Sequence, residues 1–203
     1  MHHDKHLGDA AEPLLAIDRK VREWVMPYRK SRPVKALSWI SDLGDQPQMR
    51  FLAGGMLALG ILRTDRRMTQ AGVRMLIAHE TATLAKTWIK DRIIRSRPNS
   101  AATHEEQKLR KGHDTSKEKS SFPSGHSAGI MATALAFSAE YPEHRSLALT
   151  TAGTVALAQI PRCAHYPSDV AAGLMIGTAA KVGVGRFWRW TAALFSRSRG
   201  GRF

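Results

Sequence analysis

The chain has 203 residues, of which 43% are hydrophobic, and it carries 31 Lys and Arg residues against 17 Asp and Glu residues. This length suits one domain, and the apolar content is sufficient for a packed core, which excludes wholesale disorder. The single cysteine, Cys163, excludes an internal disulfide framework and a Cys-rich zinc site. The formal net charge of +14 indicates an anionic partner: nucleic acid, a membrane surface or a phosphorylated substrate.

Residues 1–32 are predicted to form a polar tail followed by an amphipathic helix. The tail has no apolar core before a small-residue cleavage site, so we expect no secretory signal. Its histidines, His2, His3 and His6, are typical of a frayed terminus rather than a metal tract. Apolar residues recur at helical spacing over residues 14–25, with basic residues between them. Such a helix either lies on anionic lipid or covers a core as a surface helix, and both interpretations stay open.

Five later segments are apolar and alternate with charged blocks. All are rich in Ala, Leu, Met and Gly and poor in alternating β-branched residues, which predicts helices and no strand of useful length. The expected fold class is therefore all-α, a bundle of about five to six helices, with residues 33–190 as the helical domain. The five segments are 51–62, 75–89, 120–139, 146–161 and 170–180.

The polar segments between and after these helices are also distinctive. Residues 99–121 are charged and almost free of apolar side chains, which predicts a solvated loop, either a lid or simply mobile. Residues 191–203 are predicted to be a basic tail, solvated or in contact with lipid. A spanning helix needs roughly 20 apolar residues, and most of the predicted helices are shorter. Four tryptophans nevertheless lie near the ends of predicted helices, as interfacial anchors do: Trp39, Trp88, Trp188 and Trp190. The sequence is therefore compatible with both a membrane bundle and a soluble bundle.

A basic cluster follows the predicted helix at residues 75–89. Lys90 and Arg97 are seven residues apart, or two helical turns, so their side chains point the same way if the helix continues. Pro98 favours an extended conformation at the residue before it, so we expect the helix to end there. Taken alone, the cluster is also typical of a solvated or membrane-flanking helix end.

The sequence Pro123-Ser124-Gly125-His126 predicts the start of the next helix, where Pro and Ser are favoured. Free backbone N–H groups at such a start make an anion site, and Gly125 permits close approach of the ligand. A histidine placed there, His126, can donate a proton to a leaving oxygen. The alternative is a helix cap with an incidental histidine.

His165 and Asp169 are four residues apart, which places them on one face if this turn is helical. Asp169 would then accept a hydrogen bond from one ring nitrogen of His165, which fixes the tautomer. The other nitrogen would be available as a nucleophile. The alternative is a local cap in which Asp169 accepts hydrogen bonds from backbone N–H groups.

Together, Lys-x6-Arg-Pro, Pro-Ser-Gly-His and His-x3-Asp, in this order, resemble the type 2 phosphatidic acid phosphatase (PAP2) superfamily. The resemblance covers roughly residues 35–190 and favours the short bacterial membrane branch. It implies a helical bundle in the bacterial inner membrane, multi-pass, with an active site at one end. The site would face the periplasm or the outside.

By this resemblance, His165 would be the nucleophile that takes the phosphoryl group as a phosphohistidine. Asp169 would orient His165, and His126 would protonate the leaving alkoxide. The implied substrate is a lipid phosphate or diphosphate such as phosphatidic acid, phosphatidylglycerophosphate or an isoprenoid diphosphate.

The same resemblance assigns the phosphate oxygens to Lys90, Arg97 and the Ser124–Gly125 backbone. We expect no metal and no cofactor, because phosphoryl transfer needs positioning and charge stabilisation that these groups supply.

One position departs from the family pattern. Six residues before the nucleophile the family usually has Arg, and this chain has Gln159, which keeps hydrogen-bond donors but loses the charge. Arg162 lies three residues further on and is the candidate replacement among the phosphate-binding residues. Three outcomes stay open: a weaker enzyme, an enzyme that uses Arg162, and a phosphate- or lipid-binding member with little activity.

Two further questions concern partners and orientation. A nucleic-acid-binding protein would need basic residues clustered on one face, whereas these lie at helix ends, so no nucleic-acid partner is expected. The oligomeric state is not specified by the sequence. If all five segments span the membrane, the positive-inside rule places residues 63–74 and the C-terminal tail in the cytoplasm. The cationic N-terminal segment then lies on the opposite side, against that rule.

Overall fold

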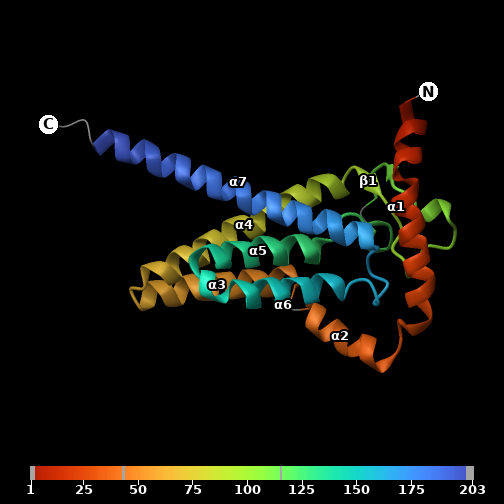
Figure 1. Cartoon of the computed structure of the whole chain (residues 1–203), viewed down its shortest axis with the longest axis horizontal. Helices are drawn as coiled ribbons and strands as arrows, with labels where there is room; N and C mark the ends of the chain where they lie inside the picture. Colours follow the sequence, from red (N-terminus) through yellow and green to blue (C-terminus); the bar gives the residue numbers. More distant parts are fainter. Residues whose placement is uncertain (1–2, 43, 115, 200–203) are drawn as a thin grey trace.

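A computed structural model describes residues 3–42, 44–114 and 116–199, and over these residues the chain is a helical bundle (Figure 1). The predicted all-α class is confirmed, with seven α-helices in the described residues where about five to six were expected. The additional helix is α2, whose charged sequence forms no apolar run. The helices are α1 (His3–Val25), α2 (Arg32–Asp42), α3 (Gln46–Leu62), α4 (Arg66–Lys90), α5 (Gly125–Glu140), α6 (Arg145–Leu157) and α7 (Pro167–Arg199).

A two-stranded antiparallel sheet lies beside the end of α4. Strand β1 (Ile93–Ile94) pairs with β2 (Arg110–Lys111), a sheet that we did not predict because two-residue strands carry no alternating pattern. Helix α4 therefore ends at Lys90, and the prediction that it continues to the residue before Pro98 was wrong. The chain is extended from Ile93 because β-branched side chains favour strands and its N–H groups find acceptors outside the helix.

Among its described residues, 99–114 and 116–121, the 99–121 segment contains no α-helix. Two short turns of 3-10 helix and strand β2 give it some order: η2 (Glu105–Gln107), η3 (Lys117–Lys119) and β2. The N–H groups of Arg95 and Arg97 donate to the carbonyls of Lys119 and Glu118, at 3.0 and 2.7 Å. The segment is therefore attached along the strand that follows α4. Its last residue, Ser121, is fully buried.

Helix α5 is the central helix of the bundle, in contact with α3, α4, α6 and α7. Its partners lie alongside it, and α7 crosses the group at an angle (Figure 1). Small side chains form the main core, which allows the backbones to approach closely. The buried members of this core are Ala53, Met75, Ala78, Ala82, Ala128, Ala132, Ala136 and Ala180.

Large apolar side chains lie mainly on the outside of this bundle. Phe51 is 84% exposed, and Leu62, Leu84 and Met175 are exposed to a similar degree. Among the described residues, one helix is long and apolar enough to cross a bilayer by itself, the Pro167–Trp190 part of α7. Only 22% of its apolar window is buried within the protein. Small residues inside and large apolar residues outside reverse the pattern of a protein core in water.

Helix α1 lies across one end of the bundle, where β1 and the start of α7 also lie (Figure 1). It begins at His3, so the tail that we expected to fray is helical from that residue, and Met1 and His2 lie outside the described residues. Its apolar residues Leu14, Ile17 and Trp24 are exposed, whereas Leu15 and Val25 are buried, so one face of α1 covers the protein and another faces outward.

The C-terminal prediction also changes. Helix α7 continues to Arg199, so most of the predicted basic tail extends this helix, and residues 200–203 lie outside the described residues.

Candidate active site

The three sequence motifs meet at the end of the bundle that α1 crosses. The Ser124 N–H donates to the main-chain oxygen of Asp169 at 3.0 Å, which joins the start of α5 to the start of α7. Close packing permits this contact, because a Cβ on Gly173 would lie 2.5 Å from the Ser124 oxygen. The Ser121 N–H donates to the Arg95 oxygen at 3.0 Å and so joins the second motif to the first.

His165 is 2% exposed and lies two residues before α7. Its Nδ1 is 2.7 Å from the main-chain oxygen of Ser121. Because a carbonyl oxygen only accepts hydrogen bonds, Nδ1 carries the proton and Nε2 keeps its lone pair. Burial lowers the pKa of His165 to about 4, so the imidazole is neutral around pH 7. These are the properties of a nitrogen nucleophile.

The predicted direct hydrogen bond between Asp169 and His165 is wrong. The Asp169 Oδ2 atom is 3.8 Å from His165 Nδ1, beyond hydrogen-bond distance, because His165 precedes the helix and turns toward Ser121. Asp169 instead accepts from the Ser121 hydroxyl at 2.5 Å and from the Tyr166 N–H at 2.9 Å. The hydrogen bond from the Tyr166 N–H is the local cap that was the alternative interpretation of Asp169 in the sequence. Asp169 therefore contacts His165 through Ser121.

His126 is the second residue of α5, which begins at Gly125 with Ser124 as its N-cap. The predicted helix start is thus confirmed. His126 Nε2 lies 2.5 Å from Oδ1 of Asp45, the residue that precedes α3. The Asp45 carboxylate favours the protonated form of the imidazole, but burial of the ring has the larger effect and lowers the pKa of His126 below its usual value.

The predicted cations Lys90 and Arg97 both lie at this end. Lys90 Nζ donates to the Ser120 main-chain oxygen at 2.5 Å, and Arg97 Nε donates to the Lys117 oxygen at 2.8 Å. Arg97 lies on the extended segment after α4, not two helical turns from Lys90. Its charge acts on both His165 and His126, so it lies near both histidines.

A third cation, Lys86, was missed by the sequence analysis. Its Nζ would lie 3.4 Å from a Cβ on Gly125, beside the start of α5. Lys86 precedes Lys90 by one helical turn, so the four-residue spacing was the available signal.

Gln159 and Arg162 have different surroundings. The Gln159 side chain is 1% exposed, and its amide donates to the Ser41 hydroxyl of α2 and to the Val155 oxygen. It therefore does not join the cations. The charge of Arg162 acts on Arg97 and on His126, which places Arg162 near them. Its Nη2 is 3.3 Å from Asp42, and its buried Nη1 has no hydrogen-bond partner among the described residues.

Arg95 is a fully buried guanidinium that the sequence analysis did not single out. Its Nη1 donates to Asp169 Oδ1 and its Nη2 to Asp18 Oδ2, each at 2.6 Å. Its Nε donates to the Gln107 oxygen at 2.8 Å. Arg95 therefore links α1, the 99–121 segment and α7. The short Arg-x-Arg-Pro pattern was the only hint of it in the sequence.

A family model described as the PAP2 superfamily matches residues 71–192, which include all three motifs. The chain belongs to the PAP2 superfamily.

Two curated PAP2 relatives match parts of the chain. The lipid A 1-phosphatase of Rhizobium etli is 38% identical over 77 residues, which are 38% of this chain and 30% of that protein. The lipid A 1-phosphatase of Rhizobium johnstonii is 42% identical over 57 residues, which are 28% of this chain and 23% of that protein. The matched segments thus span less than a third of either relative.

Two solved PAP2 structures share the fold over most of the chain. The transmembrane PAP2 type phosphatidylglycerolphosphate phosphatase from Bacillus subtilis has a TM-score of 0.61, 22% identity and coverage of 87% of both chains. LpxE from Aquifex aeolicus has a TM-score of 0.58 and 16% identity, over 82% of this chain and 93% of that one. At these identities the similarity establishes the shared helical architecture.

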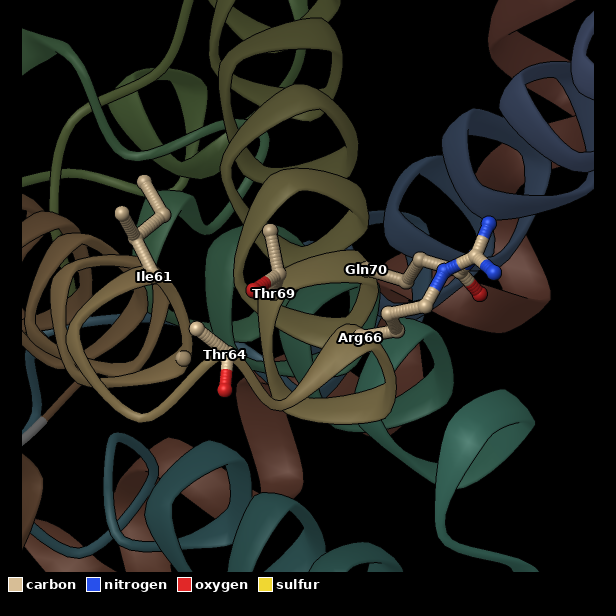
Figure 2. Close-up of a pocket in the computed structure, with 6 residues that line it drawn as sticks. Ile61, Thr64, Arg66, Thr69 and Gln70 are labelled. Atoms are coloured by element: carbon tan, nitrogen blue, oxygen red, sulfur yellow. The ribbon is translucent and has the colours of Figure 1, made fainter.

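Two features away from the motifs concern metal ligands and a surface hollow of this PAP2 chain. Within residues 3–42, 44–114 and 116–199, no group of three or more His, Cys, Asp or Glu side chains is arranged to hold a metal ion. A hollow of about 390 Å³ lies at the opposite end of the bundle, at the turn between α3 and α4 (Figure 2). Its lining contains no motif residue: Gly60, Ile61, Thr64, Arg66, Thr69 and Gln70.

Proposed function

We propose that this PAP2 chain is a metal-independent phosphatase that hydrolyses a phosphate monoester or diphosphate of a lipid through a phosphohistidine on His165. One observation carries the proposal. The hydrogen bond from His165 Nδ1 to the Ser121 oxygen leaves an unprotonated Nε2, and the charges of Arg97 and Lys90 act on the same ring. A neutral nitrogen nucleophile beside fixed cations is what attack on a phosphate anion requires.

The reaction follows in two steps. In the first, the Nε2 lone pair of His165 forms a bond to phosphorus while the bond to the leaving oxygen breaks, and His126 gives that oxygen a proton. In the second, His126 takes a proton from water as the water oxygen attacks phosphorus. The N–P bond then breaks and its electron pair returns to Nε2. Lys90, Arg97 and the backbone N–H groups at the start of α5 stabilise the phosphoryl oxygens.

The exposed surface supports a lipid substrate and a place in the bacterial inner membrane. Large apolar side chains project outward from α3, α4 and α7 around a core of small residues, as in helices packed within lipid. Exposed Trp24, Trp39 and Trp88 lie on or next to the elements at the site end, as interfacial side chains do. The chain would be multi-pass, with the site at the periplasmic or outer surface.

The candidate substrates share a phosphate headgroup on an apolar tail. Phosphatidic acid, phosphatidylglycerophosphate and isoprenoid diphosphates fit this description. The name of one relative supports phosphatidylglycerophosphate, and those of others add the 1-phosphate of lipid A. A headgroup entering from the membrane surface would meet the cations at the bundle end while its tail stays among the exposed apolar side chains.

A second candidate is a phosphate- or lipid-binding member with little activity. The observation that favours it is Gln159, whose uncharged side chain is bonded to Ser41 and does not join the cations.

Release of phosphate from the four lipid phosphates in detergent with EDTA, together with vanadate binding, distinguishes the two candidates. A phosphatase releases phosphate from at least one substrate and is inhibited by vanadate, which mimics the pentacoordinate phosphoryl group. A binding protein binds vanadate and releases no phosphate from any of them.

A further inference from the structure

A carboxylate of the N-terminal helix reaches the hydrogen-bond network behind His165. Asp18 is 1% exposed and lies on the same face of α1 as the buried Leu15 and Val25. Its Oδ1 accepts from the Ser168 N–H at 3.0 Å, and its Oδ2 accepts from Arg95 at 2.6 Å and from the Ser168 hydroxyl. Asp18 thus caps the first turn of α7, which carries Asp169. It lies outside residues 71–192, where the family model matches.

The network continues from Asp18 to the proposed nucleophile without a break. Arg95 joins the two carboxylates, with 2.6 Å contacts to Asp18 and to Asp169. Asp169 holds the Ser121 hydroxyl at 2.5 Å, and the Ser121 carbonyl holds His165 Nδ1 at 2.7 Å. All of these side chains are buried, so water screens their charges little.

The net charge of this network determines how strongly it stabilises a positive charge on His165. Arg95 alone would neutralise Asp169, and the pair would offer little stabilisation to a cation nearby. With Asp18 present, two carboxylates surround one guanidinium, so the cluster keeps one negative charge in excess. The imidazole becomes cationic when Nε2 bonds to phosphorus while Nδ1 keeps its proton. A buried negative charge close to the ring stabilises that state more than the neutral resting state.

From this geometry we propose that Asp18 is a positioning residue of the active site, which offsets the charge of Arg95 so that Asp169 stabilises the charged form of His165. The inference rests on the proposed phosphatase function. By this proposal, α1 contributes to the active site and does not serve only as a surface anchor.

The test compares Asp18→Asn with Asp18→Glu and with Glu23→Gln, an exposed carboxylate of the same helix. Asn keeps the size of Asp18 and one of its two oxygen acceptors, and its amide NH2 group takes the place of the other. The thermal midpoint of each purified full-length chain is therefore measured beside the rates. Steady-state phosphate release and vanadate affinity are measured for all four proteins in the same detergent. The wild-type rate serves as the independent check of the proposed function.

We expect Asp18→Asn to lower kcat by about 10- to 100-fold, the usual effect of losing a carboxylate that orients a reactive histidine. KM should change by less than about threefold, because ground-state binding does not involve the imidazolium. Vanadate affinity should fall together with kcat, because vanadate mimics the pentacoordinate phosphoryl group on Nε2. Asp18→Glu should recover part of the loss, and Glu23→Gln should match wild type.

Three results would overturn the inference, provided that the wild-type protein releases phosphate. The first is a kcat of Asp18→Asn equal to that of Glu23→Gln, and the second is a change in KM alone. The third is a loss of kcat that accompanies a lowered thermal midpoint and is not recovered in Asp18→Glu. If the wild-type protein releases no phosphate, the proposed function itself fails.

Discussion

The side chain of Gln159 donates a hydrogen bond to the hydroxyl of Ser41, so the residue that replaces the usual PAP2 arginine is bonded to α2 and not to the phosphate-binding groups. Arg162 lies three residues further along, and its charge acts on both Arg97 and His126. We therefore propose that Arg162 supplies the positive charge that is absent at position 159.

Removal of Arg162 should weaken the enzyme. A hydrogen bond to a charged group is worth about 1.5–3 kcal/mol, so Arg162→Ala should lower kcat/KM by about 10- to 100-fold. Gln159→Arg should restore part of this loss in the Arg162→Ala background and have a smaller effect in the wild-type chain. Phosphate release by the four proteins forms a double-mutant cycle that measures the coupling. Equal effects of Gln159→Arg in both backgrounds would show that Arg162 does not replace the missing charge.

The side chains of Ser121 and Asp169 should contribute very differently to kcat. The acceptor for His165 Nδ1 is the main-chain oxygen of Ser121, which Ser121→Ala retains. Loss of one neutral hydrogen bond costs about 0.5–1.5 kcal/mol, so this variant should lose less than about tenfold in kcat. Asp169→Asn removes the charge that stabilises the imidazolium and should lose about 100-fold. The kcat values of the two variants, measured side by side, test this order, and the reverse order would mean that Asp169 acts only as a cap.

Stability should fall in acid because His165 is buried and neutral. The unfolded chain binds the proton below about pH 6.5, whereas the folded chain binds it only below about 4. Between these values the unfolded state binds more protons, so the folded state loses stability as pH falls, by up to about 3 kcal/mol from this group. The thermal midpoint in detergent should drop more from pH 7 to pH 5 for wild type than for His165→Gln. Parallel drops would place the pKa of His165 near its ordinary value.

The protein should behave as an integral membrane protein. One described helix is long enough to span a bilayer, and large apolar side chains are exposed along the bundle. In expressing cells it should remain in the membrane fraction after a high-salt wash and an alkaline carbonate wash, and detergent should release it. Release by carbonate alone would indicate attachment through α1 and its charges only.

Most helices, and the start of α5 at the second motif, were predictable because they depend on local signals. The Ser124 cap and Gly125 mark the start of α5. The end of α4 was not predictable in this way, since Ile93 pairs with Lys111 and Ile94 with Arg110, both far along the chain. A pairing of two residues leaves no periodic pattern.

The residues behind His165 could not be found from spacing. The four-residue interval suggested a direct bond from Asp169, but His165 precedes the helix and its partner is a main-chain oxygen 44 positions earlier. Asp18 lies at helical spacing among the apolar residues of its helix, and that pattern carried no sign of what its carboxylate contacts. Its role depends on a contact with Arg95 across 77 positions, which only the tertiary structure brings together.

Phosphate release from phosphatidic acid in detergent with EDTA, for the wild-type chain and for His165→Ala, tests the central claim most directly. We predict release by the wild-type protein that survives EDTA, and none above background from the variant at an unchanged thermal midpoint. Release by His165→Ala at the wild-type rate, or complete loss of wild-type release in EDTA with recovery on adding a divalent cation, would contradict the account.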